Sequence, residues 1–113
     1  MPPFQLALYF TGPFAGVVTL WRMTFLTPTI TFSNATWIAA SLGVATNGSL
    51  VIGIYKNSVQ LATMTWISAG TIPTISVIGT TTFLANDKLD IARVSGTDTV
   101  GARLSVTLLG ARS

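Results

Sequence analysis

The sequence contains no histidine, no cysteine and no glutamate, and its only acidic residues are Asp87, Asp90 and Asp98. The usual general base, the thiol nucleophile and most metal ligands are therefore missing, and no disulfide can form. Asp87 and Asp90 are the only pair to weigh as facing carboxylates or calcium ligands. Asp87 lies in a turn, where Asp is favoured for backbone bonding, and no ligand-rich loop surrounds the pair. We predict that the protein is not an enzyme and holds no metal or cofactor.

Charge is also scarce. Only 8% of the residues are charged, against about 25% in typical soluble domains. The net charge of +3 rests on six basic residues that are scattered and form no run: Arg22, Lys56, Lys88, Arg93, Arg103 and Arg112. Nucleic-acid binders cluster such residues, so we expect no nucleic-acid partner. We expect the surface to be covered by Thr and Ser or hidden against other subunits.

Long apolar runs are absent. A membrane-spanning helix needs about 20 mainly apolar residues, but Thr19, Arg22 and Thr24 interrupt the segment Val17–Leu26. The start, Met1-Pro2-Pro3, has no basic region of the kind that opens a secretory signal. We predict neither a membrane span nor a signal peptide.

What the sequence does have is alternation with a period of two residues, which indicates strands with one buried face. Near the C-terminus, apolar residues alternate with polar ones from Ala102 to Leu108. Trp21, Met23 and Phe25 share one face of an earlier strand, which we interpret as core. About eight such short strands divide the chain, and we predict one antiparallel β-sandwich domain over residues 1–113.

Turn residues mark where these strands end. Asn47-Gly48 predicts a hairpin, because both residues tolerate positive φ. Lys56-Asn57-Ser58 predicts a second hairpin that joins strands Leu50–Tyr55 and Val59–Trp66. The segment Ser33–Ser41 is the least regular part of the chain. Further turns are expected at Thr11–Pro13, Thr27–Pro28, Ser68–Gly70, Ala85–Lys88 and Ser95–Asp98.

Aromatic side chains are the remaining candidates for binding, because they can stack on sugars or nucleobases. Trp66 shares a face with Met64, which indicates core or interface, and Trp37 lies in the irregular segment, which favours exposure. The candidate interface or receptor contacts are Trp37, Trp66 and Tyr55. We expect these side chains to contact another subunit rather than a ligand.

Several segments resemble short virion proteins of tailed bacteriophages and domains of phage fibres. The similarity consists of Ile54–Ser58, the turn-containing stretch Thr81–Leu89, Asp98-Thr99 and the final strand Leu104–Arg112. This pattern of turns and strand ends extends over most of the chain from about Leu20. The family pattern supplies no catalytic residue. Ser58 and Asn86 stand where glycine is usual in the family, and Ala111 where threonine is usual.

The resemblance implies a jelly-roll-like sandwich, often a trimer, in the virion. We therefore expect a capsid decoration (cement) protein, assembled in the host cytoplasm. Its partners would be itself, as a homotrimer, and the major capsid protein or another virion protein. The alternative is a tail-fibre or tail-tip module that binds a host glycan or protein. A third hypothesis for the same composition is a cellular β-sandwich that binds a carbohydrate or a protein.

Overall fold

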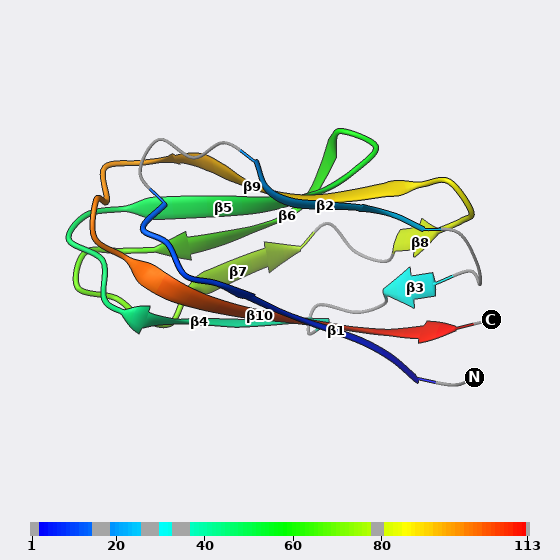
Figure 1. The fold of residues 1–113 in the computed structure, drawn as a ribbon, viewed down its shortest axis with the longest axis horizontal. Helices are drawn as coiled ribbons and strands as arrows, with labels where there is room; N and C mark the ends of the chain where they lie inside the picture. The colour runs from blue at the N-terminus through cyan, green and yellow to red at the C-terminus, as the bar shows by residue number, and fades with distance from the viewer. Residues whose placement is uncertain (1–2, 15–18, 26–29, 33–36, 78–80, 113) are drawn as a thin grey trace.

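The fold consists of two antiparallel sheets packed face to face (Figure 1). The computed structural model describes residues 3–14, 19–25, 30–32, 37–77 and 81–112, which form ten strands and no helix. No helix that could cross a membrane occurs in these ranges. The prediction of an all-β sandwich is confirmed.

Sheet A is organised around the C-terminal strand. Its strands are β1 (Pro3–Phe10), β10 (Ala102–Arg112), β4 (Ile38–Val44), β3 (Ile30–Phe32) and β8 (Thr81–Phe83). β10 pairs with β1 over an unbroken register from Pro3↔Ala111 to Phe10↔Leu104. The other edge of β10 pairs with β4 and then with β3, which in turn pairs with β8.

Sheet B has a simpler linear order, β2-β9-β5-β6-β7. Its strands are β2 (Thr19–Thr24), β9 (Lys88–Gly96), β5 (Leu50–Lys56), β6 (Val59–Trp66) and β7 (Thr74–Val77). Across the two sheets the pairing is nested, because β1 pairs with β10, β2 with β9, β3 with β8, and β5 with β6. The chain is thus wound largely as an antiparallel ribbon around the β5–β6 hairpin, with the exception of β4, which pairs with β10, and β7, which pairs with β6.

The core lies between the sheets and is built by the alternation that the sequence displays. Buried residues include Leu104, Val106 and Leu108 of β10, and Ala62, Met64 and Trp66 of β6. Each fully buried large apolar side chain contributes about 1.5–3 kcal/mol relative to exposure. An aromatic cluster closes one part of the core, with ring contacts among Phe4, Phe25, Phe32, Trp37 and Phe83.

Two local predictions differ from the structure. Ile38–Val44 is a strand, β4, where Ser33–Ser41 was expected to be irregular; residues 33–36 lie outside the described ranges. Asn47-Gly48 does not join a hairpin, since β4 belongs to sheet A and β5 to sheet B. The prediction that these two residues form a hairpin turn is wrong, because the loop passes from one sheet to the other.

Two other turn predictions are confirmed, whereas Ser95 and Gly96 of the turn expected at Ser95–Asp98 belong to strand β9. Asn57 and Ser58 have φ of 48° and 70°, and they connect β5 and β6 as a two-residue hairpin turn. Asn86 has φ of 74° in the turn before β9. Thr27–Pro28, with Val17 and Leu26 of the expected second strand, lies outside the described residues.

Candidate functional site

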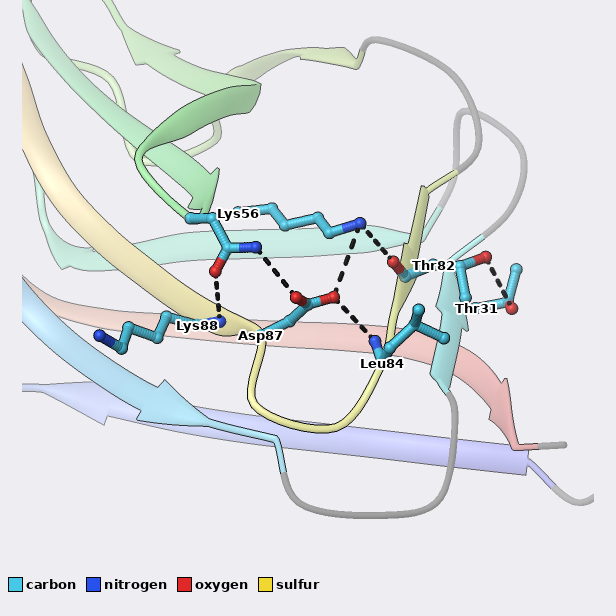
Figure 2. Close-up of polar contacts among 7 residues, drawn as sticks. Thr31, Lys56, Thr82, Leu84, Asp87 and Lys88 are labelled. Carbon is cyan, nitrogen blue, oxygen red and sulfur yellow. Dashed lines mark hydrogen bonds and ion pairs between the residues drawn. The ribbon is translucent and has the colours of Figure 1, made fainter.

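The first polar cluster joins the β5–β6 hairpin to the turn before β9 (Figure 2). Asp87 in that turn accepts hydrogen bonds from the backbone N–H of Leu84 at 2.8 Å and from Asn57 Nδ2 at 3.0 Å. Lys56 Nζ lies 3.7 Å from Asp87 Oδ2. We call Lys56, Asn57 and Asp87 the hairpin clamp.

The hairpin clamp also connects the two sheets. Lys56 Nζ donates to the carbonyl of Thr82 in β8 at 2.6 Å and lies 5.7 Å from the ring centre of Phe83. The amide oxygen of Asn57 accepts from the N–H of Lys88 at 2.9 Å, and the N–H of Asn57 donates to the carbonyl of Lys88 at 2.9 Å. Two segments of the sequence resemblance, about thirty residues apart in the chain, are therefore bonded to each other.

The electrostatics of the hairpin clamp favour the ionised carboxylate. The hydrogen bond from Asn57 and the one from the Leu84 N–H lower the pKa of Asp87. Desolvation opposes this shift, and the positive charge of Lys56 adds to it. Asp87 is thus held as an anion that organises a turn.

A second carboxylate is buried at the other end of the sandwich. Asp98 is 1% exposed and accepts from the N–H of Asn47 at 2.8 Å and from that of Gly101 at 2.9 Å. A side-chain pair adds to the contact, because Asn47 Nδ2 donates to Thr99 Oγ1 and Thr99 N donates to Asn47 Oδ1. This network ties the β4–β5 loop to the β9–β10 loop.

The third carboxylate lies on the outer face of sheet B. Asp90 of β9 accepts from Arg22 Nε at 2.8 Å and from Arg22 Nη2 at 3.0 Å. Each carboxylate thus has its own set of partners, and the described residues contain no group of three or more acidic, histidine or cysteine side chains able to hold a metal. In these arrangements the carboxylates fix turns and strand pairing.

The structure separates the three predicted contact residues. Trp37 is 1% exposed, and its ring stacks on Phe32 with centroids 4.8 Å apart. Trp66 is fully buried and donates from Nε1 to the carbonyl of Thr71 at 2.9 Å. The prediction that Trp37 is exposed is wrong, since the start of β4 carries it into the core, and neither tryptophan offers surface to a partner. Tyr55 is half-buried on the outer face of sheet B and remains a candidate contact.

A surface feature that the sequence analysis did not single out is the outer face of sheet A. Along β1 and β10, every second residue points away from the core, as the alternating burial shows, and the register of β4 places Ala39 and Ser41 beside Thr107 and Ser105. We call these residues the uncharged face: Gln5, Ala7, Tyr9, Ala39, Ser41, Ser105, Thr107 and Leu109. Arg103, beside Gly43, lies at the end of this face. The signal was present in the sequence as uncharged outward positions, but only the pairing of β1, β10 and β4 places them together.

No protein-family model matches the chain. The curated proteins give no match either. What this protein does must therefore be inferred from the contacts, charges and burial of its described residues.

Proposed function

We propose that this protein is a structural component of a tailed-bacteriophage virion, a capsid decoration (cement) protein that stabilises the shell as a homotrimer. The observation that carries the proposal is the uncharged face of sheet A. A virion component of this kind acts through permanent contacts with copies of itself and with its shell, so a broad face without charge suits it.

The strand order supports a jelly-roll-like form of the sandwich. A jelly roll is a double-sheet fold of antiparallel strands with long connections between the sheets. Here the first strand pairs with the last, β2 with β9, and the winding ends at the β5–β6 hairpin. A rolled antiparallel ribbon produces nested pairing of this kind, from which β4 and β7 depart here.

The composition of the uncharged face supports self-association. Tyr9 and Leu109 are 58% and 47% exposed, and the residues around them are small, so the sheet surface is flat enough for close approach. A specific interface buries about 800 Å² on each partner and is depleted of charge at its centre. The engagement of all three carboxylates in structural contacts supports a role without catalysis.

The size of the oligomer in solution tests whether the uncharged face is the subunit interface. Thr107 of β10 and Thr63 of β6 are both half-buried threonines on the outer faces of central strands, one in each sheet. We expect the wild type and Thr63→Lys to be trimers in light scattering after size exclusion, and Thr107→Lys to be monomeric. A monomeric wild type, or equal behaviour of the two variants, would contradict the proposed interface.

The location of the protein in the phage particle tests the proposed function. Cryo-electron microscopy of the phage particle whose genome encodes this chain should show its density on the capsid shell. Binding of the purified protein to shells that lack it should depend only weakly on salt, because few charges are available. Density at the tail tip would instead favour the receptor-binding alternative, and steep loss of binding at moderate salt would count against an apolar contact.

A further inference from the structure

A row of polar side chains crosses four neighbouring strands on the outer face of sheet B. Tyr55 of β5 is paired with Gln60 of β6 on one side and with Asp90 of β9 on the other, and Asp90 is paired with Arg22 of β2. Gln60 Nε2 donates to the Tyr55 hydroxyl at 3.2 Å, and Arg22 donates two hydrogen bonds to Asp90. These bonds hold the tyrosine ring and the carboxylate in place from opposite sides.

Beside this row, small residues leave a depression in the outer surface of sheet B. Gly53 and Ala92 are paired with each other one step along the strands. A Cβ atom on Gly53 would lie 2.9 Å from Tyr55 Cε1, 3.1 Å from its hydroxyl and 3.0 Å from Val94 Cγ2. The Tyr55 ring therefore lies across the backbone at Gly53, in a space that a larger residue would close.

A groove of about 320 Å³ results, and its lining residues are Tyr55, Ser58, Asp90, Ala92, Arg93 and Val94. Its volume falls at the lower end of the range for small-ligand sites, and its walls combine apolar surface with a few fixed polar groups, as such sites do. We propose that this groove binds one pyranose ring of a saccharide, with Tyr55 as the stacking surface and Asp90 as the hydrogen-bond acceptor.

The chemistry of the groove favours a sugar over other ligands that stack on aromatic rings. A pyranose presents C–H groups to an aromatic face and hydroxyl groups at its rim. The Asp90 oxygens each accept one bond from Arg22 and keep capacity for sugar hydroxyls, while Ser58 supplies a hydroxyl that can donate or accept. A nucleic acid is the competing ligand: of the two arginines at the groove, Arg22 is paired with Asp90 and Arg93 donates to the carbonyl of Gly96, so an oligonucleotide is included in the test.

This site is independent of the proposed function. It lies on sheet B, whereas the uncharged face lies on sheet A. The monomeric variant Thr107→Lys should therefore still bind sugar, so that failure of the trimer and failure of the sugar site are distinguishable.

Nuclear magnetic resonance tests the site with simple probes, the methyl glycosides of glucose, galactose and N-acetylglucosamine. With at least one of them, we expect saturation transfer to the sugar and amide shifts at Gly53, Ala92 and Val94. Tyr55→Ala should weaken binding about tenfold or more, because it removes the ring on which the sugar would stack. Tyr55→Phe should retain most of the binding, because it keeps the ring.

Two further variants make the result specific. Ala92→Leu should abolish binding by filling the groove while leaving Tyr55 in place, and Tyr9→Ala, which removes an exposed tyrosine from sheet A, should bind as the wild type does. Amide spectra establish that each variant is folded. The proposal is overturned if no glycoside shifts the groove amides, if Tyr55→Ala and Ala92→Leu bind normally, or if an oligonucleotide binds the groove in place of a sugar.

Discussion

Replacement of Asp98 by alanine should destabilise the protein more than any other single change to its acidic residues. The side chain is 1% exposed, and it accepts from the N–H groups of Asn47, Gly101 and, at a longer 3.5 Å, Val100. A Cβ on Gly101 would lie 2.7 Å from Asp98 Oδ2, so the loop is closely wrapped around the carboxylate. Alanine would remove every acceptor from this space at once.

The magnitude follows from the donors left behind. An unsatisfied buried donor costs about 1–3 kcal/mol, and the two short bonds, to Asn47 and Gly101, dominate here. Water entering the vacated space would recover part of this cost, so we expect a loss of about 3 kcal/mol in the free energy of unfolding. For a domain of this size that corresponds to a decrease in Tm of roughly 10–20 °C.

Urea denaturation followed by tryptophan fluorescence measures this loss directly. Asn47→Ala is the matched control, because it removes the side-chain pair with Thr99 but keeps the backbone N–H that Asp98 accepts. The control should cost no more than about 1 kcal/mol, as exposed hydrogen bonds contribute little. If Asp98→Ala costs no more than the control, the buried carboxylate does not organise the loops and the reasoning fails.

Three other changes have defined outcomes. Trp37→Ala should cost about 3–5 kcal/mol, because it empties the site stacked on Phe32, and circular dichroism should show a matching fall in Tm. The lowered pKa of Asp87 means that its ionised form stabilises the fold above the pKa it has when unfolded, and this contribution is lost as pH falls through the folded pKa. The urea midpoint of Asp87→Asn should therefore fall less than that of the wild type between about pH 5 and pH 2. Ser58→Gly should raise the free energy of unfolding by about 0.5 kcal/mol in the same urea assay, because serine has φ of 70° there and glycine adopts that conformation without strain.

Local turn chemistry was predictable from the sequence at Asn57-Ser58 and at Asn86, but it did not show which strands a turn joins. Asn57-Ser58 connects β5 directly to β6, so its preference for positive φ and its position in the fold agree. Asn47-Gly48 has the same local signal but another use. A Cβ on Gly48 would overlap Thr97 Oγ1, so this glycine permits close packing against the β9–β10 loop. That contact is non-local, and no short segment of the sequence encodes it.

The burial of side chains was predictable for strands in which apolar and polar residues alternate clearly. The prediction failed where this alternation is weak. The run Ala39-Ala40-Ser41 in β4 contrasts little between its two faces, so the sequence indicated neither the strand nor the burial of the neighbouring Trp37. Strand β4 is stabilised by pairing with β10, whose paired residues lie 58 to 70 positions away in the chain. The contribution of Tyr55 to a groove depends in the same way on β9, whose register no local pattern specifies.

The positions of the three acidic residues show what these few charges do in the structure. Each of the three carboxylates belongs to β9 or to a turn beside it, and each bonds to a different element: Asp87 to the β5–β6 hairpin, Asp90 to β2 and Asp98 to the β4–β5 loop. These contacts join segments that are distant in the chain, and they add to apolar packing, which already opposes a one-residue slip because the slip would move buried side chains to the solvent face. A slip of β2 by one residue would turn Arg22 toward the core and leave Asp90 without its partner, which makes the alternative register costly. The three carboxylates thus help to fix which elements pack beside β9, and the uncharged face of sheet A contains none of them.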